Sequence, residues 1–249
     1  MKIDPLENVV NFSQTESTAK KFRNDLPISD ELKEVLLTKI FGDFAKEVIV
    51  AHLEDCQKEL KDFIDEHHPQ EDKKSSLEHN LFWWSILYQV SKGIEVTFVK
   101  NYIEKNYVFL KNKPVIISWL KEWEKAVTKF YYVGYKYNDQ VLVLVDILTE
   151  QTVDVIVYDR DAIPPKQGEI VMGTLIPIGA GLYFPIIDFY HFEYEARVPI
   201  AQSVKHYYDQ YLKSCTMQEA FLHVLSDTLQ IENIILTEKK RNITLPSSE

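Results

Sequence analysis

The sequence predicts an α+β protein, with an N-terminal helical part, a small antiparallel β-barrel or twisted sheet, and C-terminal helices. Two observations predict this order. Apolar residues recur at helical spacing up to residue 129, alternate with polar residues over 130–195, and return to helical spacing from Ala196. Five of the seven glycines, which mark turns, also fall within 130–195. We therefore predict three regions, 1–129, 130–195 and 196–249, which can pack as one domain.

Four helices are predicted in the first region. Residues 30–66 form one long helix or two consecutive ones, and a polar run containing Pro69 follows. Each helix has a residue at its start that commonly begins helices: Ser29 or Asp30, Ser75 with Glu78, Thr97, and Pro114. All four tryptophans lie in this region at helical spacing, which favours a place in the core.

The second region predicts short strands joined by tight turns. Their ranges are 130–137, 141–148, 153–158, 169–176, 182–187 and 188–195. The uncharged stretch 170–187 is long enough to cross a membrane, but its two prolines and three glycines favour a hairpin that turns at 179–181. The third region predicts a helix over 196–212 and a last helix capped by Thr216 with Glu219.

Charge is distributed unevenly around the net value of −10. Residues 30–72 hold 13 acidic and 5 basic side chains, and residues 130–195 hold 10 and 3, whereas residues 73–129 hold 5 and 10. Nucleic-acid binding requires basic side chains gathered on one surface, so this distribution argues against it. The two acidic segments instead favour one of two roles: they bind a protein partner with a basic surface, or they keep the protein soluble. They leave the oligomeric state open.

Cysteine usage and the first residues indicate a cytoplasmic protein. Cys56 and Cys215 are the only cysteines, and a pair this sparse is typical of reduced proteins. No CxxC is present, which excludes a thiolate zinc site by spacing. The first twenty residues lack a basic start followed by an apolar run, so no secretory signal is expected.

One candidate site lies on the predicted strand 188–195. Alternation places His191, Glu193 and Glu195 on one face, where an imidazole and two carboxylates suit a divalent metal or acid–base chemistry. The same alternation is typical of any half-buried strand, with the aromatic residues inward and the polar ones outward. On the last helix, Glu219, His223 and Asp227 share a face, a weaker pattern that is also typical of a solvated surface.

A second candidate is Asp146. If Asn138-Asp139 forms a two-residue turn, Tyr137 pairs with Gln140 and Tyr131 pairs with Asp146. Asp146 then shares a face with leucines, where a carboxylate needs a partner or its pKa rises. It is then either an acid whose pKa is adjusted for chemistry, or a structural residue. In the structural role the carboxylate forms a hydrogen bond with Tyr131 or caps the end of the barrel, and we favour this role.

Motifs of known chemistry are missing: the sequence has no GxxxxGK[ST], GxGxxG, GxSxG or HExxH. No cofactor is predicted. The leading hypothesis is therefore a non-enzymatic binding or interaction protein with acidic surfaces. The alternative is a carboxylate- and His-dependent enzyme, hydrolase or nuclease-like, with its site on the β region. A concave pocket that joins His191 and the two glutamates to another acid would favour the enzyme.

Three short segments carry a resemblance: 119–123 (WLKEW), 167–171 (QGEIV) and 175–177 (LIP). In this order, over residues 80–235, the chain resembles uncharacterised bacterial proteins found mainly in Firmicutes. Some of those proteins carry a Cys-rich SEC-C zinc motif, which this chain lacks. The resemblance implies a bacterial, cytoplasmic protein and carries over no zinc site.

Overall fold

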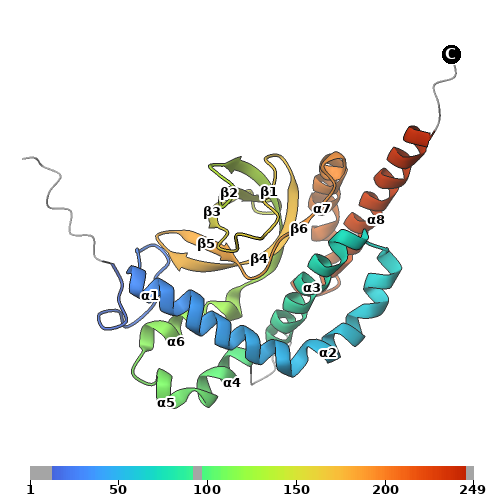
Figure 1. Ribbon diagram of the computed structural model, residues 1–249. Helices are drawn as coiled ribbons and strands as arrows, with labels where there is room; N and C mark the ends of the chain where they lie inside the picture. Colours follow the sequence, from blue (N-terminus) through green and yellow to red (C-terminus); the bar gives the residue numbers. More distant parts are fainter. Residues whose placement is uncertain (1–12, 92–96, 245–249) are drawn as a thin grey trace, which may run out of the picture.

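The structure is a computed structural model that describes residues 13–91 and 97–244, with side chains described up to 87 and 241 in these two segments. It confirms the predicted α+β class. N-terminal helices are followed by a closed five-stranded barrel and then by C-terminal helices that return to the side of the barrel (Figure 1).

The N-terminal helices begin with one continuous rod, so the first of the two alternatives for residues 30–66 holds. It consists of α1 (Asp30–Glu34), a π-helical segment η1 (Val35–Ile40) and α2 (Phe41–His67). The Ser29 side chain caps it by accepting the backbone N–H of Leu32, as predicted. In Figure 1 this rod runs beneath the barrel. The rod ends at His68, whose left-handed conformation (φ 43°) reverses the chain.

The next helix begins earlier than predicted. Helix α3 (Glu71–Ser91) starts four residues before Ser75, because the backbone N–H groups of Lys73 and Lys74 already bond to the Gln70 carbonyl. The Ser75–Glu78 capping box is therefore wrong. Thr97 does cap the following helix, and Pro114 does lie in a first turn. The remaining segments are α4 (Phe98–Lys105), α5 (Tyr107–Leu110), α6 (Pro114–Leu120) and a 3₁₀ turn, η2 (Trp123–Lys125).

The barrel is mixed rather than purely antiparallel. Its strands are β1 (Thr128–Lys136), β2 (Val141–Asp146), β3 (Thr152–Ile156), β4 (Ile170–Gly179) and β5 (Leu182–Pro185). They close in the order β1-β2-β3-β5-β4-β1, and β3 pairs with β5 in parallel. A closed ring with an odd number of strands must contain a parallel pair. The hairpin predicted around 179–181 is confirmed by the β4–β5 pairing.

The β1–β2 register confirms one predicted pair and corrects another. Tyr131 lies opposite Asp146, as predicted. Tyr137 does not pair with Gln140, because its N–H bonds to the Val141 carbonyl and the turn holds three residues. A bulge at Gly134 adds one residue to β1, which offsets the longer turn and restores the register.

The strand predicted over 188–195 is wrong for most of its length. Only Tyr190–His191 forms a strand, β6, which pairs with β4 outside the closed barrel. A 3₁₀ turn, η3 (Tyr194–Ala196), follows it and leads into α7 (Arg197–Tyr211) and α8 (Met217–Thr244). Thr216 and Glu219 form the predicted capping box of the last helix: each side chain accepts the other residue's backbone N–H.

Apolar clusters join the barrel to the helices on two sides. One cluster places Ile176, Ile178 and Phe184 of the barrel against the N-terminal helices, with Trp119 and Trp123 fully buried among them. The other gathers residues from α2, α3, the barrel, α7 and α8. The tryptophans at 83, 84, 119 and 123 are all buried, as predicted. The barrel is therefore held between two sets of helices, and the candidate site lies at one junction.

Candidate functional site

Three of the four predicted site residues line one pocket, although they do not share a strand face. His191, Glu193 and Glu195 border a cavity of about 430 Å³ between the barrel, the start of α3 and the end of α8. The rest of its lining comprises Asp72, Lys73, Ser76, Ile163, Pro164, Lys166, Glu169, Asp188, Phe189, Phe192, Tyr194 and Lys239. The pocket is concave and brings further acids to the predicted residues.

The chain leaves the sheet after Phe192, and a contact with α8 holds the turn that follows. Phe192 still donates its N–H to the Ile170 carbonyl of β4. The N–H of Glu193, however, bonds to Oε1 of Glu232 on α8, at 2.7 Å. The backbone therefore turns toward α8, and Glu193 and Glu195 reach the pocket from a turn instead of from a strand.

His191 is held by Glu169, a residue that sequence reasoning missed. Its Nδ1 lies 3.2 Å from Oε2 of Glu169, which also accepts the backbone N–H of Lys166 at 2.7 Å. Nε2 of His191 is buried and has no hydrogen-bond partner among the described residues. Glu169 precedes β4, and only the pairing of β4 with β6 brings it to His191, so no local pattern could have identified it.

Glu193 belongs to a partly buried network around Lys73. The Lys73 ammonium donates to Oε1 of Glu193 at 2.9 Å and to Oε1 of Glu232 at 2.8 Å. Burial alone would raise the pKa of Glu193, but the hydrogen bonds from Lys73 and Gln70 lower it below its usual range. Tyr190 donates to the other oxygen of Glu232 at 2.7 Å. This network ties α3, the η3 turn and α8 together.

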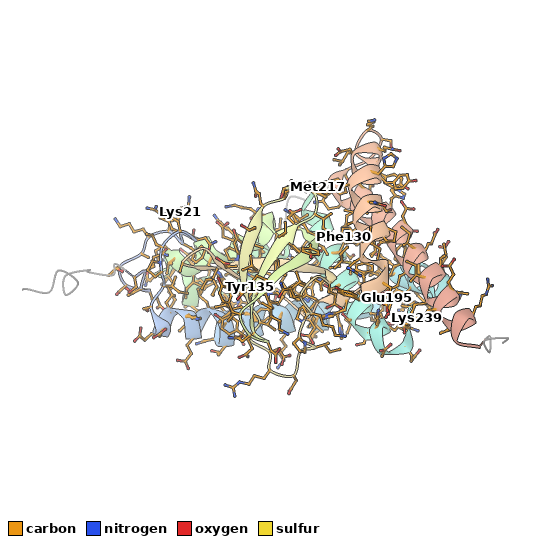
Figure 2. All side chains as sticks on the ribbon, turned by 90° about the horizontal axis from the view of Figure 1, so that it is seen from above. Lys21, Phe130, Tyr135, Glu195, Met217 and Lys239 are labelled. Carbon is orange, nitrogen blue, oxygen red and sulfur yellow. The ribbon has the colours of Figure 1, made fainter. Side chains whose placement is uncertain are left out.

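Glu195 lies at the rim of the pocket. Its carboxylate accepts a hydrogen bond from Lys239 on α8 at 2.9 Å, and the two side chains are about half exposed. Figure 2 shows the two residues next to each other toward the outer end of that helix. The hydrogen bond from Lys239 lowers the pKa of Glu195, so the residue stays charged at neutral pH.

Asp188, also missed by the sequence analysis, is a half-buried pocket acid whose charge has no close partner among the described residues. Its carboxylate forms no hydrogen bond or ion pair in the part of the chain that the structure describes, although its backbone carbonyl accepts from Asn80. Burial raises the pKa of Asp188, as does the negative charge of Asp159, while His191 and His79 oppose the rise. A half-buried, uncompensated negative charge therefore faces this cavity.

Asp146 lies outside the pocket and is satisfied locally. Its Oδ2 accepts from Lys129 at 2.6 Å, and its Oδ1 accepts the N–H groups of Leu148 and Thr149. Burial would raise the pKa of Asp146, but the hydrogen bond and charge of Lys129 and these N–H groups lower it. The side-chain partner of this carboxylate is Lys129 rather than Tyr131, and the structural role stays a prediction. Asp146 caps the end of β2.

The weaker pattern on the last helix is explained by neighbouring contacts. Glu219 caps α8, His223 stacks on Tyr211 with ring centroids 4.9 Å apart, and Asp227 accepts from the Tyr211 hydroxyl. Within 13–91 and 97–244, no three His, Cys, Asp or Glu side chains converge so that they could hold a metal ion. Cys56 and Cys215 are free thiols.

Among the described residues, no helical segment combines the length and the apolar character that a bilayer crossing requires. Comparison of the chain with protein-family models, curated proteins and solved structures found no match. The resemblance to bacterial proteins and the cytoplasmic location thus stay predictions.

Proposed function

We propose that this chain is a non-enzymatic binding protein whose acidic pocket receives a lysine or arginine side chain of a protein partner. The observation that carries the proposal is Asp188, a half-buried carboxylate in the pocket wall with neither a hydrogen bond nor an ion pair from the described residues. A buried charge of this kind is costly until an opposite charge reaches it. A basic side chain supplies that charge.

The charge of the pocket wall supports this occupant. Five carboxylates, those of Asp72, Glu169, Asp188, Glu193 and Glu195, line the cavity against three lysines. Two of the lysines show how the wall holds an ammonium group, since Lys73 and Lys239 lie 2.8–2.9 Å from glutamate oxygens. A partner's ammonium or guanidinium would meet the same chemistry at Asp188.

The position of the pocket also agrees with the two acidic segments of the sequence. Asp72 ends the segment 30–72, and Asp188, Glu193 and Glu195 belong to the segment 130–195. The fold brings the ends of both segments to one cavity. Their combined field would draw a basic surface toward the pocket before contact, and this attraction weakens with added salt.

A nucleic-acid partner has less support. Five-stranded barrels of the OB type bind single strands on the face of their second and third strands, where stacked aromatics are surrounded by basic side chains. This barrel does expose tyrosines, among them Tyr135, which is labelled on the barrel in Figure 2. However, β3 adds Asp154 to that face, and Lys136 is paired with Asp139. The aromatic surface therefore lacks the cations that phosphate groups need.

Selection of random short peptides displayed on phage tests the proposal. We expect wild-type protein to enrich peptides that contain lysine or arginine, and Asp188→Asn to lose most of that enrichment. Asp154→Asn, a removal of one exposed acid on β3, is the matched control and should select as the wild type does. Selection without a basic residue, or equal selection by the wild type and Asp188→Asn, would refute the proposal.

An acid–base enzyme is the second candidate, because His191 and the glutamates do meet further acids in a concave pocket. Two observations count against it: Nε2 of His191 is buried, and Glu193 is engaged by Lys73. Turnover of p-nitrophenyl acetate or bis(p-nitrophenyl) phosphate that His191→Gln abolishes would favour the enzyme over the binding protein.

A further inference from the structure

A second cavity adjoins the pocket and shares one wall with it. This cavity of about 280 Å³ lies between the N-terminal rod and the barrel, and it is lined by Leu37, Phe41, Val157, Tyr158, Asp159, Phe184, Pro185, Ile186, Ile187 and Asp188. Asp188 thus borders both cavities. We call the first the acidic pocket and the second the apolar pocket.

Aromatic rings form much of the apolar pocket. Phe41 and Tyr158 each meet the ring of Phe184 edge-on, with centroids 5.7 and 6.2 Å apart. Tyr158 is 37% exposed, so this wall is open to a ligand. Leu37 belongs to the π-helical segment η1, and such segments are common at functional sites.

The charges around the apolar pocket set the direction in which a ligand must lie. The ammonium of Lys33 lies over the ring of Tyr158, 5.2 Å from its centroid, on the N-terminal rod. This ammonium opposes the charge of Asp159, which lines the apolar pocket together with the shared Asp188. The other eight lining residues of the apolar pocket are apolar or aromatic, whereas the acidic pocket has five carboxylates. A basic group therefore belongs in the acidic pocket and an apolar group in the apolar one.

We propose that the two cavities form one bipartite site, which takes a basic side chain and a large apolar side chain from the same segment of a protein partner. This inference rests on the proposed function and deepens it. Because Asp188 borders both cavities, the two side chains must lie close together along the partner. In an extended segment, side chains two residues apart lie on one face, about 7 Å apart. We therefore infer a basic and an apolar or aromatic residue separated by one residue.

The peptides selected on the wild-type protein test this spacing. We expect Phe, Tyr, Trp, Leu or Ile to be enriched two positions from the basic residue. The selected peptide is then synthesised with a fluorescent label, together with a version in which alanine replaces the apolar residue. The affinity of each for the wild-type protein, Tyr158→Ala, Tyr137→Ala and Asp188→Asn is measured by fluorescence anisotropy.

Tyr158→Ala removes part of the apolar wall at an exposed position, so the fold is expected to survive. It should weaken binding of the selected peptide about tenfold, which is the effect of losing one buried apolar contact, and leave the alanine version unchanged. Tyr137→Ala is the matched control: Tyr137 is 66% exposed on the barrel and borders neither cavity. It should bind both peptides as the wild type does.

The outcomes separate this inference from the proposed function. Enrichment of basic residues with no apolar preference, or an apolar preference that Tyr158→Ala leaves intact, overturns the bipartite site alone. Absence of any basic enrichment overturns both. Binding of the labelled peptide that is lost in Asp188→Asn and selectively reduced in Tyr158→Ala supports both.

Discussion

At the scale of single residues, Asp146 and Asp188 show how surroundings assign different roles to the same side chain. Asp146 accepts hydrogen bonds from Lys129 and from two backbone N–H groups, which hold its pKa below the usual range. Asp188 has no such donors, and its burial near Asp159 raises its pKa. Asp146 therefore stabilises the folded protein. The charge of Asp188 destabilises it, and we expect a bound cationic group to offset that cost.

Replacing Asp188 by asparagine should stabilise the free protein at neutral pH. The raised folded-state pKa means that the charged form is less favourable in the folded than in the unfolded chain. This penalty is complete above the folded-state pKa and disappears as the pH falls toward the unfolded value of about 3.9. Thermal unfolding should show a higher Tm for Asp188→Asn at pH about 7, with a smaller advantage at pH about 4.

Asp154→Asn serves as the control for this measurement, since Asp154 is exposed on β3 and should change stability by less than about 0.5 kcal/mol. A lower Tm for Asp188→Asn at neutral pH would show that the carboxylate has a stabilising partner, contrary to our account.

Replacing Asp146 by asparagine should have the opposite effect. Asparagine keeps an oxygen for the N–H groups of Leu148 and Thr149 but loses the ion pair with Lys129, which is partly exposed and screened. We expect a loss of about 1–3 kcal/mol in the free energy of unfolding at neutral pH, measured by urea denaturation.

The pH dependence gives a further check on Asp146. Because its folded-state pKa is lowered, its contribution is present above the unfolded-state pKa and is lost as the pH falls through the folded-state pKa. The difference between the wild type and Asp146→Asn should therefore shrink in acid. A constant difference would mean that the ion pair does not cause it.

At the scale of elements, strand β4 positions the segment that both cavities share. Gly173 on β4 lies against the ring of Phe189, which follows Asp188. A Cβ at this position would lie 2.6 and 2.9 Å from two ring carbons of Phe189. The glycine is needed here for close approach, and the wall of the acidic pocket depends on it.

Gly173→Ala should therefore destabilise the protein by about 1–3 kcal/mol and weaken peptide binding, because Phe189 must move. Gly42→Ala is the matched change. A Cβ added at Gly42 would have nothing within 4 Å, and in helix α2 alanine should raise the free energy of unfolding by up to about 1 kcal/mol. Chemical denaturation compares the two variants. Equal effects would contradict the role assigned to Phe189.

The elements also show what can be predicted from sequence. Helices with local start signals, such as Thr97 and Pro114, were predicted because the signal lies next to the element. The strand predicted over 188–195 is wrong beyond His191, because the turn that replaces it is held by a distant residue, Glu232, which accepts the N–H of Glu193. The Glu169–His191 contact depends equally on a pairing between distant strands. The alternating pattern predicted that His191 and Glu193 share one face of a strand, but the strand ends at His191.

At the scale of the whole molecule, the proposed site depends on how the helices pack against the barrel. Helices from both ends of the chain contact it, and their junctions form the two cavities that meet at Asp188. The charge pattern of the sequence predicted two acidic segments, and folding brings one end of each to the same pocket. The central claim is that Asp188 binds a basic group there.

A double-mutant cycle tests this claim most directly. The affinities of the wild type and Asp188→Asn are measured for the selected peptide and for a version with glutamine in place of its basic residue. If the two groups interact, the second substitution costs little once the first has been made, and the coupling energy is about 1 kcal/mol or more. Additive effects, with a coupling energy near zero, would show that Asp188 does not contact the basic residue and would contradict the account.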